Sequence, residues 1–463
     1  MFDFDLDKHS INHIHFIGIG GISMSALAQI LINFDYKVTG SDMNDSEITK
    51  KLSSQGATIH MGHNKNNISN PDLVVYTAAV KENNPELVEA RTKEIPILSR
   101  AEMLGLLMKK FKNNIAVAGT HGKTTTTSMI SVILDYNKYS PTILVGGQLD
   151  NIGGNVKVGS RDYFVTEACE YVGSFLKFFP TIGIILNIEE DHLDYFKDLD
   201  HIKETFKEFI DLIPKDGLLI AYGDDPNIQS IIDHVHCNLV TYGKDNNSDY
   251  YPSNISFNDL GYPSFDLYKR DEFLGKINLK VPGEHNLFNS LASIACCHHF
   301  GIDIDHINEA LNTFGGTHRR FDLLGHINNI KIVDDYAHHP TEIEATLKAL
   351  SNMDHNNLWC VFQPHTFTRT LCLLDEFSQA LAEVDNLIIT DIYAAREKDT
   401  GEIHSKDLVK KIKKHNDKVK YMKEFDSIVN YIYENAKPND LVITMGAGNV
   451  NSIGEQLVQK LKG

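Results

Sequence analysis

The chain has 463 residues, 42% of them hydrophobic, and a formal net charge of −18 at pH 7. At roughly 150 residues per domain, this length predicts two to four domains with cores of their own. The acidic balance excludes a protein that presents a basic face to nucleic acid. It does not exclude phosphorylated small ligands, because backbone amides and a few cations are enough to bind them.

Composition also bears on the compartment. The six cysteines form no C-x-x-C pair, which favours reduced thiols in the cytoplasm over a disulfide framework. Residues 1–12 are acidic and polar, unlike a signal peptide. The most apolar window, residues 14–32, is interrupted by glycines and polar residues, so it predicts a strand and a helix. We therefore expect a cytoplasmic protein with no membrane partner.

The chain opens with a nucleotide-binding pattern. Residues 13–18 predict a strand, 25–33 a helix and 37–39 a second strand, with Asp42 just after it. The first turn is rich in glycine, and its residues of interest are Gly18, Gly20, Gly21, Ser23 and Met24. Ser23 stands where the dinucleotide fingerprint has its third glycine, which weakens the case for NAD. Asp42 either binds a ribose hydroxyl or begins a turn.

A phosphate-binding loop is predicted after a domain boundary near Asn113. An apolar strand at 115–118 and a helix at 128–134 flank Gly119-Thr120-His121-Gly122-Lys123-Thr124-Thr125. Glycines let backbone N–H groups close on phosphate oxygens, and the start of a helix adds positive potential. Lys123 would reach the terminal phosphates and the Thr124 hydroxyl would hold Mg2+. The alternative is a glycine-rich turn with a surface lysine, since Val117 replaces the first glycine of the common pattern.

Two acidic motifs follow predicted strands in the same domain. Strands at 162–166 and 181–188 are followed by Glu167 and by Asp191-His192. Because parallel strands end at one edge of a sheet, Glu167 and His192 are expected beside the loop, where they and Thr124 can share a divalent cation. The alternative is a pair of solvated caps. Residues 145–147 and 153–155 predict flexible turns, near a ligand or in hairpins.

Polar residues also mark the next two segments. Asn286 and Asn289 lie three residues apart at the start of a helix predicted at 287–300, where they either cap the helix or contact a base or substrate. A glycine-rich hinge then carries Arg319 and Arg320. Arginine suits bidentate binding of phosphate, with one of the pair expected to be structural.

The last third of the chain predicts another doubly wound sheet, from Asp322 onwards. Strands at 331–333, 358–362, 387–390 and 441–444 each end in a polar or glycine-rich loop before a helix. His338, His339, His365 and Arg369 gather at these strand ends. Any one histidine could occupy the surface without a role, but the cluster favours a site.

Eight motifs, in this order, resemble those of the Mur ligases of peptidoglycan synthesis, and the resemblance covers nearly the whole chain. They are Gly18–Met24, Gly119–Thr126, Glu167–Tyr171, Asp191-His192, Gly283–Asn286 with Asn289, Arg319–Asp322, Asp334–Pro340 and Met445–Gly448. The position of Val117 then fits, since the loop of this family is shorter at that end.

The resemblance implies an α/β fold of three doubly wound domains. These are an N-terminal Rossmann-like domain for the UDP-linked substrate (1–112), a central P-loop ATPase (113–321) and a mobile C-terminal Rossmann-like domain that binds the amino acid and closes on ATP (322–463). It implies an enzyme of cell-wall biogenesis that joins the lactyl carboxylate of UDP-N-acetylmuramate to the amine of L-alanine. ATP becomes ADP and phosphate through an acyl phosphate, and the enzyme is a monomer or homodimer.

The resemblance also assigns roles to single residues. It places Thr124 and Glu167 on one Mg2+ and His192 on a second, with Mn2+ as a substitute. Residues near ATP would be the phosphate loop, His285, Asn286, Asn289, Arg319 and Asp335. Residues facing the amino acid and the acyl phosphate would be Tyr336, His338 and Arg369. The glycine turn and Asp42 would bind the UDP-linked substrate, and the catalytic residues would be Lys123, Glu167, His192, His338 and Arg369.

Two positions depart from the family pattern, and three other functions compete. Thr366 stands where many members have arginine, and neither Lys203 nor Lys207 matches the carbamylated lysine of sister ligases closely enough to take that role. The rivals are a murein tripeptide ligase of wall recycling, a non-catalytic nucleotide-binding protein and an NAD-dependent dehydrogenase. Ser23 and the central phosphate loop count against the dehydrogenase, and the C-terminal motifs favour alanine over the tripeptide.

Overall fold

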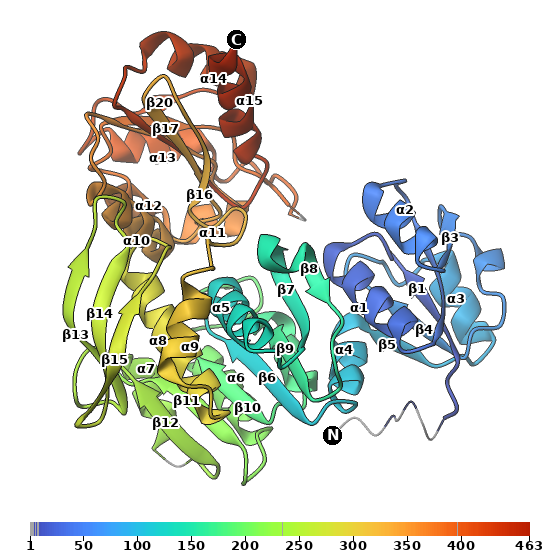
Figure 1. The fold of residues 1–463 in the computed structure, drawn as a ribbon. Coiled ribbons are helices and arrows are strands. Elements are labelled where there is room, and N and C mark those ends of the chain that lie inside the picture. Colours follow the sequence, from blue (N-terminus) through green and yellow to red (C-terminus); the bar gives the residue numbers. More distant parts are fainter. Residues whose placement is uncertain (1–3, 5, 7–8, 234, 396) are drawn as a thin grey trace. The chain divides into compact units, whose positions relative to one another are not determined.

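The computed structural model describes residues 4, 6, 9–233, 235–395 and 397–463, and it confirms an α/β fold with three sheets (Figure 1). The chain divides into two compact units. Unit 1 comprises residues 1–188, 202–242 and 292–302, and unit 2 comprises 189–201, 243–291 and 303–463. All six cysteines are unpaired, as predicted. None of the helices within the described residues combines the length and the apolar character needed to span a bilayer.

The first sheet belongs to unit 1 and is wholly parallel, in the order β3-β2-β1-β4-β5. Its strands are β1 (His13–Ile17), β2 (Lys37–Asp42), β3 (Thr58–Met61), β4 (Leu73–Tyr76) and β5 (Ile97–Ser99). Its helices are α1 (Ile22–Asn33), α2 (Glu47–Ser54), the short η1 (Lys65–Asn67), α3 (Pro85–Thr92) and α4 (Arg100–Met108). The strand order reverses between β1 and β4, which in such sheets opens a ligand crevice at the carboxyl ends. The predicted β-α-β unit is confirmed, although α1 begins earlier than expected and takes in Ser23 and Met24.

A buried carboxylate ties the loops of this sheet together. Glu86 has no exposed surface and accepts hydrogen bonds from Ser41 Oγ (2.6 Å) and Asn67 Nδ2 (2.5 Å). His15 Nε2 lies 3.7 Å from the same carboxylate. Burial alone would raise the pKa of Glu86, but the nearby His15 ring and the hydrogen bonds from Ser41 and Asn67 outweigh it and lower the pKa to about 2. The carboxylate is therefore ionised in the folded protein, and its hydrogen-bond partners stabilise the charged form.

The second sheet of unit 1 runs in the order β12-β11-β10-β6-β9-β7-β8, parallel except for the β7–β8 hairpin. Its strands are β6 (Asn113–Ala118), β7 (Thr142–Leu149), β8 (Gly154–Lys157), β9 (Tyr163–Glu167), β10 (Ile182–Ile185), β11 (Leu218–Tyr222) and β12 (Asn238–Tyr242). Helical segments that accompany it are α5 (Lys123–Tyr136), η2 (Asp150–Ile152), η3 (Tyr171–Lys177), α6 (Leu199–Asp211) and α7 (Pro226–Ile232).

One detail of this sheet differs from the sequence prediction. Gly146 and Gly147 lie inside β7, so the turn predicted at 145–147 was wrong, whereas Gly153 does lie in the hairpin turn and Gly154 begins β8. The interior of β6, from Ile115 to Ala118, has no exposed surface. An apolar central strand of this kind fixes where the following loop emerges from the sheet.

Unit 2 contains an antiparallel meander that the sequence did not suggest, made of β13 (Tyr250–Phe257), β14 (Pro263–Lys269) and β15 (Glu272–Asn278). It also contains the third sheet, in the order β16-β17-β21-β18-β19-β20, parallel except for the β16–β17 hairpin. The strands are β16 (Asp322–Ile327), β17 (Ile330–Asp335), β18 (Leu358–Phe362), β19 (Asn386–Ile389), β20 (Lys420–Tyr421) and β21 (Leu441–Met445). The remaining helices are α8 (Glu284–His299), α9 (Ile304–Leu311), α10 (Pro340–Ser351), α11 (Phe367–Cys372), α12 (Leu374–Ala380), α13 (Ser405–Ile412), α14 (Phe425–Asn435) and α15 (Asn451–Lys462).

The third sheet buries both faces, as a doubly wound sheet must. Cys360 and Phe362 of β18 join one apolar cluster with α10, α12 and α13, while Trp359 and Val361 join another with α14 and α15. This alternation follows from the two-residue period of a strand. Trp359 donates its indole N–H to Asp440 Oδ2 at 3.0 Å, so its polar edge is satisfied inside the core.

Glu86→Gln should destabilise the protein by ~3 kcal/mol at neutral pH, because Gln cannot carry the charge that the network stabilises. A carboxyl whose pKa is lowered by folding contributes stability above its unfolded pKa of 4.5 and loses it as the pH falls toward about 2. The difference in free energy of unfolding between wild type and variant should therefore narrow below pH 4.5. Urea unfolding followed by circular dichroism measures it. The exposed Glu94→Gln serves as control, and a gap that stays constant from pH 7 to 3.5 would contradict the network.

Candidate active site

The predicted phosphate loop joins β6 to α5. Gly119 has φ +142° and Gly122 has φ +82°, so both adopt backbone conformations that favour glycine. Asn187, in the loop after β10, fastens the turn: its backbone carbonyl accepts from Thr120 N (3.1 Å) and its side-chain Oδ1 accepts from His121 N (2.7 Å). The loop is thus held to the neighbouring strand end and has the shape that cradles phosphate at a helix start.

Lys123, the first residue of α5, has its ammonium turned back onto its own loop. Nζ donates to the carbonyl of Gly119, to Thr120 O (3.0 Å) and to Glu170 Oε2 (3.1 Å). Burial would lower the pKa of Lys123, but the charge of the buried Glu170 more than offsets it and the pKa is raised. Lys123 is therefore a largely buried cation with a counter-ion, and the alternative of a surface lysine is wrong for this residue.

The carboxylate predicted to hold a metal ends β9. Glu167 Oε1 accepts from Gly146 N of β7 at 2.5 Å, and a Cβ at Gly146 would come within 2.9 Å of that oxygen. The glycine inside β7 therefore makes room for the carboxylate. Thr124 is buried in the first turn of α5, and Thr125 beside it is half-buried. The Thr124 hydroxyl and the Glu167 carboxylate, both oxygen groups that can bind a metal ion, therefore lie at the same edge of the sheet.

The glycine turn of the first sheet is closed by β2. Gly18 has φ +82°, and the N–H groups of Gly18 and Ile19 donate to Ser41 O at 2.8 and 3.0 Å. Gly20 N donates to Asp42 Oδ2 at 2.8 Å, while Asp42 Oδ1 accepts from Asn44 N. Asp42 thus begins a turn and also buttresses the glycine turn, with Gly21, Ser23 and Met24 following it into α1.

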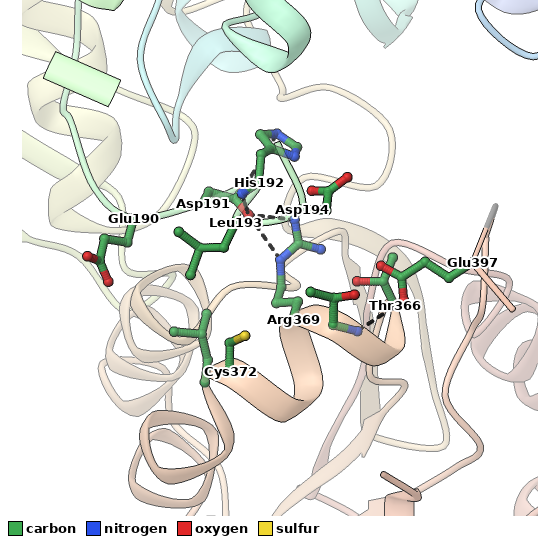
Figure 2. A pocket seen from close by; sticks show the side chains of 11 residues that line it. Glu190, Asp191, His192, Leu193, Asp194, Thr366, Arg369, Cys372 and Glu397 are labelled. Carbon is green, nitrogen blue, oxygen red and sulfur yellow. Dashed lines mark hydrogen bonds and ion pairs between the residues drawn. The ribbon is translucent and has the colours of Figure 1, made fainter. Parts of the chain in front are cut away.

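In unit 2, the Asp-His motif meets an arginine of the third sheet, as Figure 2 shows. Arg369 Nη2 and Nε donate to Asp191 Oδ1 at 2.7 and 3.2 Å, and both side chains are 9% exposed. Burial would raise the pKa of Asp191, but Arg369 overrides this and lowers it well below its usual range. The pair lines a pocket whose other residues are Glu190, His192, Leu193, Asp194, Thr366, Thr368, Cys372, Leu373 and Glu397.

Histidines surround this ion pair. His192 Nε2 lies 3.7 Å from Asp191 Oδ2, and the backbone of His192 is left-handed at φ +52°. His365 Nδ1 lies 3.1 Å from Arg369 Nη1, and the His338 ring lies 5.6 Å from the His365 ring. Of the four residues predicted to gather at these strand ends, His338, His365 and Arg369 are linked by these contacts, whereas His339 Nε2 lies 3.1 Å from Glu190 O.

Tyr336 and the two arginines of the hinge form a second group. The guanidinium groups of Arg319 and Arg320 lie 4.8 and 4.9 Å from the centre of the Tyr336 ring. Arg319 Nη2 also donates to Gly446 O at 2.8 Å, a residue of the Met445–Gly448 motif. Burial raises the pKa of Asp335 to about 7, although Arg320 opposes this shift. Asp335 accepts from Phe321 N and Ala337 N, so it also shapes the loop that presents Tyr336.

The remaining predicted residues are engaged locally. Asn286 Nδ2 donates to Pro282 O (2.7 Å) and Asn289 Nδ2 to Asn286 Oδ1 (3.1 Å), so both amides bond within the start of α8. Burial lowers the pKa of His285 to about 4, which keeps its imidazole neutral.

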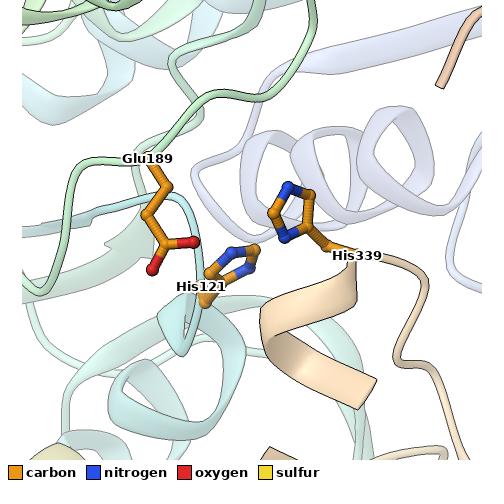
Figure 3. A group of neighbouring side chains, drawn as sticks. All are labelled: His121, Glu189 and His339. Atoms are coloured by element: carbon orange, nitrogen blue, oxygen red, sulfur yellow. The ribbon is translucent and has the colours of Figure 1, made fainter. Parts of the chain in front are cut away.

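Three further side chains are drawn in Figure 3. His121 lies on the phosphate loop of unit 1. In unit 2, Glu189 accepts from Thr341 Oγ1 at 2.7 Å, and His339 Nε2 lies 3.1 Å from Glu190 O. Their backbones place all three residues on loops at strand ends, the part of an α/β fold that carries ligand contacts.

Sequence reasoning missed three residues that the geometry brings forward. Glu170 neutralises Lys123, Asp191 holds Arg369, and Asn187 fastens the phosphate loop. Glu170 and Asp191 stand in motifs that the sequence analysis named, and Asn187 lies in the strand predicted at 181–188. A carboxylate in such a motif carries no local sign of which cation it will pair with. A buried cation always requires a partner, which is the signal that could have prompted the search.

Three Mur ligase family models match the chain. They are described as Mur ligase family catalytic domain (residues 13–112), Mur ligase middle domain (117–297) and Mur ligase glutamate ligase domain (319–448).

Named relatives align with this chain over nearly its full length. The chain is 54% identical to a UDP-N-acetylmuramate–L-alanine ligase of Acetivibrio thermocellus, covering 98% of this chain and 97% of the relative. It is 54% identical to one of Clostridium botulinum strain Okra, covering 99% of each. Among solved structures, the UDP-N-acetylmuramate–alanine ligase of Thermotoga maritima matches with a TM-score of 0.81 and 30% identity, over 97% of this chain and 99% of that one. A murein peptide ligase of Psychrobacter arcticus matches with a TM-score of 0.71 and 27% identity, over 97% and 98%.

Asp191→Asn should lower the free energy of unfolding by about 3 kcal/mol, because it leaves the Arg369 guanidinium buried without a counter-ion. Denaturant unfolding measures the change. Glu47→Gln, which breaks the exposed pair with Lys50, provides the control and should cost less than about 1 kcal/mol. Equal effects of the two substitutions would show that the buried pair contributes no more than a surface one.

Proposed function

This chain belongs to the Mur ligase family, and on that premise we propose that it is the ATP-dependent ligase that joins UDP-N-acetylmuramate to L-alanine in peptidoglycan synthesis. The observation that carries the choice of substrates is 54% identity, along nearly the entire chain, to relatives that bear this name. The observation that supports ATP is the phosphate loop before α5, with its lysine and two carboxylates.

The chemistry activates a carboxylate, which is a poor acylating agent. The lactyl carboxylate attacks the γ-phosphate of ATP and forms an acyl phosphate, with ADP as the leaving group. The amine of L-alanine then attacks the acyl carbon, and the tetrahedral intermediate expels phosphate. Charge on the transferring phosphoryl group has to be neutralised, and Lys123 is the cation that the loop supplies.

Thr124 and Glu167 are proposed to hold Mg2+, and His192 a second ion. Hydroxyl and carboxylate oxygens fit Mg2+, and an imidazole ligand makes Mn2+ an effective substitute at the second position. When bound, divalent cations neutralise phosphate charge and orient the phosphates for in-line attack. Glu167 is prepared for this role because Gly146 N–H fixes the orientation of its carboxylate.

Residues of the third sheet are proposed to handle the amine and the acyl phosphate. Arg369 has one edge of its guanidinium, Nε and Nη2, hydrogen-bonded to Asp191, so its orientation is set before any substrate arrives. His338 lies beside Tyr336, with ring centres 5.4 Å apart, and its Nδ1–H donates to the backbone carbonyl of Tyr336 at 3.0 Å. Near adenine we place His285, Asn286 and Asn289, and near the nucleotide Arg319 and Asp335.

The glycine turn of the first sheet, from Gly18 to Met24, is proposed to bind the UDP-linked substrate together with Asp42. We further propose domain boundaries at 112/113 and 321/322, a cytoplasmic location where ATP is available, and a monomer or homodimer. No lysine is assigned a carbamylated role.

A second candidate is the murein tripeptide ligase, favoured by the structural likeness to the Psychrobacter arcticus protein. The two functions differ in the acceptor only. Phosphate release should be measured with ATP, Mg2+ and UDP-N-acetylmuramate, across single amino acids and the wall tripeptide. We expect release that depends on L-alanine. Release with the tripeptide alone would establish the recycling enzyme, and silence with every acceptor would overturn the ligase proposal.

Lys123→Ala should reduce ADP formation at least a thousandfold, because no other cation of the loop replaces it. Removing it also leaves Glu170 without its partner, so thermal unfolding must be measured in parallel. Lys215→Ala, an exposed lysine of unit 1, is the control. An unchanged kcat in a folded Lys123→Ala variant would remove the loop from the mechanism.

A further inference from the structure

His63 belongs to the polar network of the first sheet, at the edge where the strand order reverses. Ser41 is near the end of β2, His63 follows β3 by two residues, and Glu86 opens α3 after β4. His63 Nδ1 lies 3.0 Å from Ser41 Oγ and 3.4 Å from Glu86 Oε2. The backbone carbonyl of the same Ser41 accepts from the glycine turn, so His63 and that turn share one residue. His63 therefore lies at the carboxyl edge that holds the crevice of such sheets.

The order of donors fixes the tautomer of His63. Glu86 is ionised and only accepts, so Ser41 Oγ donates its proton to Glu86 Oε2 at 2.6 Å. The Ser41 oxygen then has to accept from His63, so in the neutral form of the imidazole the hydrogen lies on Nδ1. Nε2 of His63 is left with a lone pair and acts as an acceptor.

The network does not need His63 to satisfy Glu86. Ser41 Oγ, Asn67 Nδ2 and Asn64 N already donate to the two carboxylate oxygens. The His63 side chain is 20% exposed, and no described residue forms a hydrogen bond with Nε2. Nε2 is not a buried atom: it retains exposed surface that a ligand can reach.

We propose that His63 Nε2 accepts a hydrogen bond from the nucleoside of the UDP-linked substrate, with Ser41 and Glu86 as positioning residues. The inference rests on the proposed function and deepens it, since it names a specificity contact for the uridine moiety. Two donors of a uridine fit an acceptor: a ribose hydroxyl and the N3–H of uracil. Cytosine has no N3–H, so a contact to N3 would also exclude cytidine nucleotides.

The test is isothermal titration of UDP, 2′-deoxy-UDP and CDP into the full-length protein. His63→Asn keeps an amide donor near the Nδ1 position and removes Nε2, whereas His63→Gln restores a polar group near Nε2. We expect His63→Asn to raise the Kd for UDP about tenfold, the size of one hydrogen bond, with His63→Gln between it and wild type. The KM for ATP and the melting temperature should not change. His60→Asn, a half-buried neighbour in β3, is the matched control.

The three nucleotides identify the donor. If the ribose donates, 2′-deoxy-UDP binds wild type more weakly than UDP does, and His63→Asn removes that difference. If uracil N3 donates, CDP binds wild type more weakly than UDP does, and His63→Asn removes that difference. An unchanged Kd in a folded His63→Asn variant, or discrimination that survives the substitution, would overturn the inference, as would failure of wild type to bind UDP. Failure of the ligase proposal is a separate result, because UDP binding needs no turnover.

Discussion

A charge withdrawn from water must be balanced nearby, and this requirement decides where the candidate site residues point. Lys123 is balanced by Glu170, Arg369 by Asp191, and Glu86 by hydroxyl and amide donors. In each case the partners come from another segment of the chain, such as the loops after β9 and β10 for Glu170 and Asp191 and the end of β2 for Ser41. The functional loops are therefore fastened to one another by the same groups that would meet a ligand.

This arrangement gives the phosphate loop a defined ligand-free geometry. The ammonium of Lys123 occupies the carbonyls of Gly119 and Thr120 as well as Glu170. An incoming phosphate would have to compete with these acceptors for the same cation. Because phosphate oxygens also bring negative charge, the exchange conserves the local balance, and Glu170 would be the group whose surroundings change most.

Much of the architecture could be predicted from the sequence. The apolar run of β6, the first glycine turn and four strands of the third sheet (β17, β18, β19 and β21) formed close to where they were predicted, because their patterns depend on local periodicity. The meander β13–β15 was missed, since only its middle strand β14 alternates between buried and half-buried residues along its length, whereas β13 and β15 do not. Gly146 was assigned to a turn because glycine usually marks one, but it lies in β7 to accommodate Glu167. The pairs Lys123–Glu170 and Arg369–Asp191 join residues 47 and 178 positions apart, a distance that no local pattern encodes.

The position of Trp359 gives the molecule an internal reporter. It is the single tryptophan of the chain and is 6% exposed. It lies in β18, and its indole joins the apolar cluster formed with the helices α14 and α15. Tryptophan emission excited at long wavelength therefore comes from the third sheet of unit 2 alone. Fluorescence and far-ultraviolet dichroism would then report on different parts of the protein, so unequal transitions in the two signals would reveal that its sheets do not unfold as one.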